Sequence, residues 1–198
     1  MDERPTAHLT AGGWDVCTCF NYNSLDASDV EKWQEYEEVT VVAWSMGVWA
    51  AEQVLTGLDL PITQAVAING TPKPVDDAQG IPLATAQATL DGLTPDSLRR
   101  FYRRMLGGGN LLKEMDEAGQ LPRIDFDERK EELRRIIAAQ PYPDTGFRWN
   151  RAIIGTADAI FPPANLRAAW KGKAGIVEID APHYPFRQLK TWEEVIGE

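Results

Sequence analysis

The sequence has few of the residues on which several classes of protein depend. Its two cysteines, Cys17 and Cys19, are too few for a disulfide framework or a four-ligand zinc site. No apolar run approaches the roughly 20 residues that a membrane-spanning helix needs, and the charged start Met1-Asp2-Glu3-Arg4 leads into no apolar signal core. We therefore expect a protein of a reducing, cytoplasmic setting that does not enter a membrane and holds no metal.

Basic residues are also scarce. The chain has 20 lysines and arginines against 30 aspartates and glutamates, a net charge of −10, which argues against a nucleic-acid partner because phosphates need a basic face. The charge is uneven: residues 1–98 hold 3 basic and 15 acidic side chains (net −12), whereas residues 99–135 hold 10 basic and 8 acidic (net +2). An acidic partner is therefore expected to dock on the middle stretch.

At 198 residues and 43% hydrophobic composition, the chain is expected to form a single domain. Short β-branched runs alternate with helical patterns, which predicts an α/β fold with a mostly parallel sheet. The expected strands are 15–22, 39–44, 65–68, 151–154 and 175–180. The expected helices are 28–36 (with Ser28 as N-cap), 48–55, 97–106, 127–139 and 163–171, and the helical stretch of about 83–140 is expected to be an insertion.

A serine stands between a buried strand and a helix, in the run Ala43-Trp44-Ser45-Met46-Gly47. A strand-to-helix turn of this kind exposes the Ser45 hydroxyl at the sheet edge, as in the G-x-S-x-G turn of serine hydrolases, although Ala43 replaces the first glycine. The backbone N–H of Met46 is the expected donor to a developing oxyanion, and Trp44 is expected to wall an acyl pocket. The alternative is that Ser45 is a simple N-cap residue.

Two further residues favour a catalytic role for Ser45 over a role as N-cap. Asp158 and His183 each follow a predicted strand, in Gly155-Thr-Ala-Asp158 and Asp180-Ala-Pro-His183. The chain order Ser, Asp, His is that of the α/β-hydrolase fold, and the carboxyl ends of parallel strands meet at one sheet edge. We therefore expect His183 to act as general base for Ser45, with Asp158 orienting the imidazole. Taken singly, Asp158 is also a candidate helix cap and His183 a candidate surface residue.

The other candidates are weaker. His8 lies in a polar N-terminal segment, and Asp180 is too close to His183 along the chain to orient it. We expect Cys17 and Cys19 to be core thiols, the Gly107-Gly108-Gly109 run to be a joint between helices, and the Asp76-Asp77 pair to form a solvated turn.

Longer motifs resemble a known family. The runs Val41-Val-Ala-Trp-Ser-Met-Gly-Val-Trp49, Ile68-Asn-Gly-Thr-Pro72, Asp158-Ala-Ile-Phe-Pro-Pro-Ala-Asn165 and His183-Tyr-Pro-Phe186, together with Asp76-Asp77 and Gly80-Ile81, are similar to the BioG-type pimeloyl-[acyl-carrier protein] methyl ester esterases. The likeness extends from about residue 15 to the C-terminus. It implies an α/β-hydrolase fold and the roles of nucleophile, orienting acid and base for Ser45, Asp158 and His183.

The resemblance further implies a serine carboxylesterase of biotin synthesis that releases methanol from the carrier-bound ester without a metal or organic cofactor. We expect Arg99, Arg100, Arg103 and Arg104, in the only net-positive stretch, to help dock the acidic acyl-carrier protein. The alternative is that these arginines pair with nearby acids. A thioesterase or small-ester esterase with the same three residues, or an inactive relative that binds the carrier protein, are the alternative functions.

One departure from the family concerns the N-terminus. Members of the family carry a strand and a Gly-Trp-Gly loop before a segment that resembles Met1-Asp-Glu-Arg-Pro5. That loop donates the second oxyanion N–H, and losing such a donor typically costs about 10²–10³ in rate. We therefore expect the natural protein to be longer at this end, with codons for the strand and loop upstream in the gene.

Overall fold

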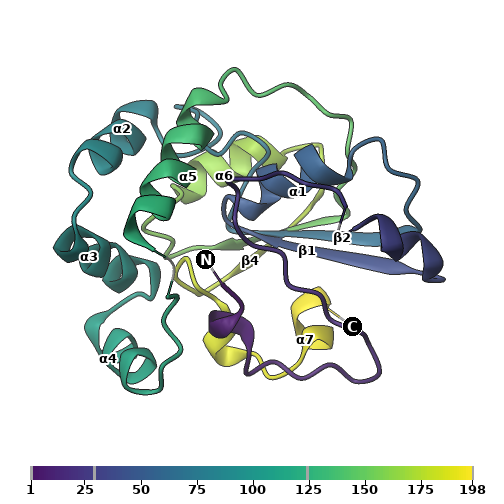
Figure 1. Ribbon diagram of the computed structural model, residues 1–198, viewed down its shortest axis with the longest axis horizontal. Coiled ribbons are helices and arrows are strands. Elements are labelled where there is room, and N and C mark those ends of the chain that lie inside the picture. Colours follow the sequence, from purple (N-terminus) through teal and green to yellow (C-terminus); the bar gives the residue numbers. More distant parts are fainter. Residues whose placement is uncertain (1, 29, 124, 198) are drawn as a thin grey trace.

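A parallel sheet of four strands organises the computed structural model, which describes residues 2–28, 30–123 and 125–197 (Figure 1). The strands are β1 (Val39–Trp44), β2 (Ile62–Ile68), β3 (Arg151–Gly155) and β4 (Gly175–Ile179), in the order β1-β2-β3-β4. Each neighbouring pair is parallel, with Val41 opposite Ala65 and Ala67 opposite Ala152. The predicted α/β class is therefore confirmed, and all four strands point their carboxyl ends to one edge.

The strands separate two hydrophobic cores because successive side chains of a strand point to opposite faces. On β2, Ala65 and Ala67 belong to one core, and Val66 and Ile68 to the other. The first core lies under α1 (Gly47–Leu55) and α6 (Pro163–Trp170), and the second includes residues of α7 (Trp192–Ile196). Figure 1 shows α1 and α6 above the sheet and α7 below it.

In the described residues between β2 and β3, four helices stand at one end of the sheet (Figure 1). They are α2 (Leu83–Asp91), α3 (Pro95–Met105), α4 (Gly109–Glu117) and α5 (Phe126–Ala138). Thr94 and Ser97 form a reciprocal capping box at the start of α3, and Asp125 caps α5 through the N–H groups of Asp127 and Glu128. Gly107, at φ +74°, makes the turn between α3 and α4.

The strand expected at 15–22 is absent, and this prediction was wrong. The segment has no regular secondary structure and runs over the surface, with Val16 50% and Phe20 44% exposed. A strand forms only where a neighbouring strand accepts its hydrogen bonds, and the sheet of the described residues begins at β1, whose partner is β2. Cys17 and Cys19, predicted as core thiols on that strand, are consequently exposed.

The short helix expected at 28–36 is reduced to a 3-10 turn, Glu31–Glu35, whose N-cap position is Val30 rather than Ser28. Asp29, part of the expected capping box, lies outside the described residues. The N–H of Ser28 donates to Oδ1 of Asp26 (2.9 Å), so this polar run forms an Asx turn instead. No helix in the described part of the chain is long and apolar enough to cross a membrane.

Candidate active site

Ser45 occupies a strained turn between β1 and α1. Its φ of +60° is left-handed, which costs a serine free energy that the surrounding packing must offset. The Ser45 N–H donates to the carbonyl of Ile68 at the end of β2 (2.8 Å). The turn also lies against Gly70, where a β-carbon would come within 2.0 Å of the Ser45 carbonyl oxygen, so only glycine fits there.

His183 and Asp158 lie in a hydrogen-bonded line with this serine. Nε2 of His183 is 2.9 Å from Ser45 Oγ, and Nδ1 is 2.8 Å from Oδ2 of Asp158. The second oxygen of Asp158, Oδ1, accepts the backbone N–H groups of Ile160 (2.7 Å) and Phe161 (2.9 Å). With Nδ1 protonated and donating to Asp158, Nε2 is free to accept the Ser45 proton, which is the arrangement of a general base beside a nucleophile.

Aromatic rings enclose the imidazole. The ring of Phe161 stacks on His183 with centroids 5.8 Å apart, and the ring of Trp44 lies 5.4 Å away. The His183 side chain is 1% exposed, so water does not compete for its hydrogen bonds. Trp44 also donates from Nε1 to the His183 carbonyl oxygen (2.8 Å), which ties the end of β1 to the histidine loop.

Asn69 is a component of the site that the sequence named only within the motif Ile68-Asn-Gly-Thr-Pro72. It is buried at the end of β2, with φ +45°. Its Nδ2 donates to the carbonyls of Pro182 (3.1 Å) and His183 (3.0 Å), and its Oδ1 accepts the N–H of Gly155 (2.6 Å). One amide therefore holds the loops after β3 and β4, which carry Asp158 and His183.

An inner cavity of about 170 Å³ opens beside Ser45. Its wall is mostly apolar, with Trp44 and Met46 next to the serine, and an outer groove of about 1310 Å³ lies next to it. Cavity and groove share the lining residues Thr85, Thr89, Leu93, Phe101, Arg104 and Ala159. The reaction cavity and the outer groove therefore adjoin each other along these residues.

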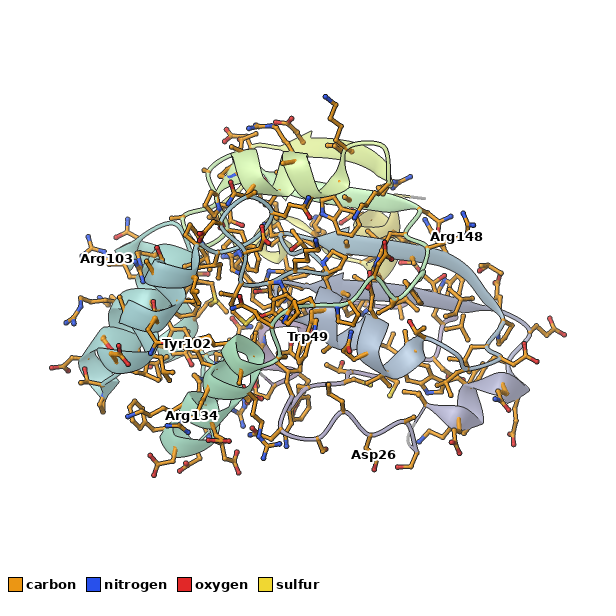
Figure 2. All side chains as sticks on the ribbon, turned by 90° about the horizontal axis from the view of Figure 1, so that it is seen from above. Asp26, Trp49, Tyr102, Arg103, Arg134 and Arg148 are labelled. Atoms are coloured by element: carbon orange, nitrogen blue, oxygen red, sulfur yellow. The ribbon has the colours of Figure 1, made fainter. Side chains whose placement is uncertain are left out.

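The α3 arginines differ in their placement. Arg100, Arg103 and Arg104 line the outer groove, whereas Arg99 forms an exposed ion pair with Asp116 (2.8 Å). In Figure 2, Arg103 projects from the outer margin of the molecule, and Tyr102 lies on the inner side of the same helix.

The remaining candidates lie outside this arrangement. His8 is part-buried, and its Nε2 is 3.0 Å from the carbonyl oxygen of Phe186. Asp76 and Asp77 accept turn N–H groups, those of Ala78 and Leu83 respectively (2.9 and 2.8 Å). Among the described residues, no group of histidine, cysteine and acidic side chains is arranged to hold a metal ion.

Comparison with known proteins identifies relatives of this chain. The family model described as pimeloyl-ACP methyl esterase BioG matches residues 6–195. The crystal structure of BioG from Haemophilus influenzae superposes with a TM-score of 0.85 at 33% identity, covering 98% of this chain and 88% of that one. A protein of Bacteroides fragilis named malonyl-[acyl-carrier protein] O-methyltransferase is 43% identical over 194 residues, which are 96% of this chain but 39% of that protein.

More distant structures share only the fold. A bromoperoxidase from Bacillus anthracis has a TM-score of 0.57 at 17% identity, covering 80% of this chain and 65% of that one. Human thioesterase 2 has a TM-score of 0.51 at 12% identity, covering 85% and 74%. These likenesses, with the BioG structure, confirm the α/β-hydrolase type of fold that the chain order of Ser45, Asp158 and His183 predicted.

Proposed function

Because the chain belongs to the pimeloyl-ACP methyl esterase BioG family, we propose that it is a serine carboxylesterase that hydrolyses the methyl ester of pimeloyl-[acyl-carrier protein] and releases methanol in biotin synthesis. The observation that carries the serine mechanism is the hydrogen-bonded line from Ser45 through His183 to Asp158. We also propose that residues 83–140 form a lid insertion of a single α/β-hydrolase domain, and that the protein acts in the cytoplasm.

The chemistry follows from the line of hydrogen bonds. His183 Nε2 takes the Ser45 proton as Oγ attacks the ester carbonyl, and the imidazolium that forms is stabilised by Asp158. The same proton then passes to the leaving methoxide, which departs as methanol. Water, activated by His183, hydrolyses the acyl-serine and leaves the free carboxylate. Neither a metal nor an organic cofactor takes part in this scheme.

Met46 is the proposed oxyanion donor. It directly follows Ser45 and is the N-cap of α1, so its N–H belongs to the first helical turn, where a helix offers its own amides no acceptor. We propose that this N–H donates to the carbonyl oxygen as it becomes negative, and that the helix dipole adds to the effect.

The groove supports a carrier-bound substrate. A pimeloyl chain reaching Ser45 through the groove leaves its thioester arm between α3 and the histidine loop, both of which line that groove. Arg100, Arg103 and Arg104 then face an incoming acidic carrier protein, and we propose that they dock it with Arg99 at the margin. Trp44 walls the acyl cavity beside the nucleophile.

The test of the activity is direct. Purified protein incubated with pimeloyl-[acyl-carrier protein] methyl ester is expected to release methanol and to give the free acid by mass spectrometry of the carrier. Ser45→Ala is expected to abolish the conversion, and a fluorophosphonate probe is expected to label Ser45 in the wild type. Absence of labelling would favour an inactive carrier-binding relative, and preference for a matched thioester would favour a thioesterase.

The docking proposal has its own test. Reversing the charges of Arg100 and Arg103, which line only the outer groove, with Arg100→Glu and Arg103→Glu is expected to raise KM for the carrier-bound ester and to spare a small soluble ester. Arg148→Glu is the matched control, because Arg148 is exposed and lies at the opposite end of the molecule from Arg103 (Figure 2). Equal losses on both esters would reject docking by these arginines.

A further inference from the structure

Arg129, on α5, has an unusual environment for an arginine. Its Nε and Nη2 atoms are buried and have no hydrogen-bond partner within the described part of the chain. Buried guanidinium groups are normally paired because removing their hydration is costly. The pair of nitrogens left without a partner is the edge of the guanidinium that binds a carboxylate side-on, as Nε and Nη2 of Arg167 bind Glu178 (2.9 and 2.7 Å).

This guanidinium belongs to the reaction cavity rather than to the carrier groove. Arg129 lines the inner cavity together with Ser45 and Tyr22, and none of these three lines the outer groove. Arg104, in contrast, lines both and stands at their junction. Arg129 is therefore a cationic group on the wall of the space in which the acyl end of the substrate reacts.

The acidic groups near Arg129 form no direct ion pair with it in the described part of the chain. Glu132, three residues further along α5, also lines the cavity, but its Oε1 accepts the N–H of Tyr22 (3.0 Å). No ion pair within 4.0 Å joins Arg129 to Glu132 or to another acid among residues 2–28, 30–123 and 125–197. The ring of Tyr102 lies 5.9 Å from the Arg129 Cζ and packs against the cation without neutralising it.

Tyr22 lines the cavity with Arg129 and Ser45, and its hydroxyl lies near the start of α1. Its hydroxyl oxygen lies 3.2 Å from the position that a β-carbon on Gly47 would occupy, at the start of α1 and two residues beyond Ser45. Burial raises the pKa of the Tyr22 hydroxyl and the nearby Glu132 raises it further, whereas the nearby Arg129 lowers the pKa. Arg129, Tyr22 and Ser45 thus line the same cavity, with the Tyr22 hydroxyl close to the start of α1.

We propose that Arg129 forms an anion subsite that binds the carboxylate created when the ester is hydrolysed. The proposal rests on the function proposed above and adds to it. The methyl ester that enters the cavity is neutral, whereas the acid that remains after hydrolysis carries a negative charge in a mostly apolar space. In this proposal the Arg129 side chain turns its unpartnered Nε and Nη2 edge toward the carboxylate and compensates that charge, so the acid form binds more tightly than a neutral chain of equal length.

The test uses heptanoate as the probe, because it has one carboxylate on an acyl chain of the right length, and heptanamide as its neutral counterpart. Binding is measured by titration calorimetry, which needs no turnover. The wild type is expected to bind heptanoate roughly tenfold or more tightly than heptanamide, since charge-assisted hydrogen bonds are worth about that much. Arg129→Gln is expected to remove this preference, and Arg129→Lys to retain part of it.

The matched control is Lys130→Gln, which removes a positive charge from the next residue of α5 at a position that does not line the cavity. It is expected to bind both probes as the wild type does. Equal affinity of the wild type for heptanoate and heptanamide would overturn the proposal without the need for any variant, as would an unchanged preference in Arg129→Gln with native near-UV circular dichroism. A protein that binds heptanoate through Arg129 but hydrolyses no ester would instead contradict the proposed function alone.

Discussion

Replacing Asp158 by Asn exchanges one oxygen for an amide nitrogen, and we expect it to lower kcat by about 10⁴ with little effect on the fold. The reason lies in how the two carboxylate oxygens are used. Oδ1 accepts the N–H groups of Ile160 and Phe161, and Oδ2 accepts His183 Nδ1–H. An asparagine keeps its oxygen facing the two backbone donors, because the reverse orientation would leave both of them unpaired.

In that orientation the new amide N–H₂ faces the imidazole, so His183 must present an unprotonated Nδ1 to accept from it. The ring proton then resides on Nε2, which lies 2.9 Å from Ser45 Oγ and can no longer accept the serine proton. A 10⁴-fold loss corresponds to about 5.5 kcal/mol of transition-state stabilisation. Because the side chain keeps its size, unfolding is expected to occur at nearly the same denaturant concentration.

The assay is steady-state hydrolysis of a chromogenic ester at neutral pH, with urea unfolding in parallel. Asp180→Asn is the control, since Asp180 is an exposed aspartate at the end of β4, three residues before His183. It is expected to retain wild-type kcat. If Asp158→Asn retained more than one tenth of the wild-type kcat, the orientation of the imidazole by this carboxylate would not be what makes His183 a base.

Two further changes test how the site is held, and a third tests the buried carboxylate of Glu52 on α1, which accepts hydrogen bonds from Thr145 and Trp149. Asn69→Ala leaves the buried Gly155 N–H and the Pro182 and His183 carbonyls without the side-chain amide, and is expected to cost about 3 kcal/mol in urea unfolding together with a fall in kcat. Gly70→Ala forces a β-carbon to 2.0 Å from the Ser45 carbonyl oxygen, and is expected to cost about 3 kcal/mol and to abolish fluorophosphonate labelling. Burial raises the pKa of Glu52 above 4.5, so the folded protein holds this proton more tightly than the unfolded chain does. The contribution of Glu52 to the free energy of unfolding therefore falls as the pH rises above 4.5. Glu52→Gln is therefore expected to be as stable as the wild type or more stable at pH 7, and to lose this pH dependence in urea unfolding across pH 4–8. The first expectation would be contradicted by wild-type kcat in Asn69→Ala, and the second by fluorophosphonate labelling of Gly70→Ala. The third would be contradicted if the stability of Glu52→Gln depended on pH as that of the wild type does.

The sequence identified the part of the fold whose signals are local. Runs such as Val39–Trp44 and Arg151–Gly155 are β-branched and apolar because both faces of the sheet are covered, and that composition is visible without knowing the neighbours. The residues directly after these strands meet because parallel strands end at one edge. Element order was therefore enough to bring Ser45, Asp158 and His183 together as candidates.

What the sequence did not reveal depends on long-range neighbours. The 15–22 segment has the composition of a strand but no strand beside it among the described residues, so its composition alone misled. Arg129 stands in the charged run Asp127-Glu-Arg-Lys130, which is typical of a solvated helix face, and only the packing of α5 over the cavity buries its guanidinium. Nothing in the sequence of this run distinguishes Arg129 from its neighbours.

The position of β2 inside the sheet explains how the relative positions of Ser45 and His183 are held. β2 lies between β1 and β3, and the turn after it meets the loops of both neighbours. Gly70 lets the Ser45 carbonyl approach from one side, while Asn69 binds Gly155 and the His183 carbonyl on the other. The distance between Ser45 and His183 is thus fixed through backbone groups rather than through the reacting side chains. Substitutions in this turn should therefore lower stability and activity together, whereas substitutions within the proposed catalytic line, such as Asp158→Asn, should lower activity alone.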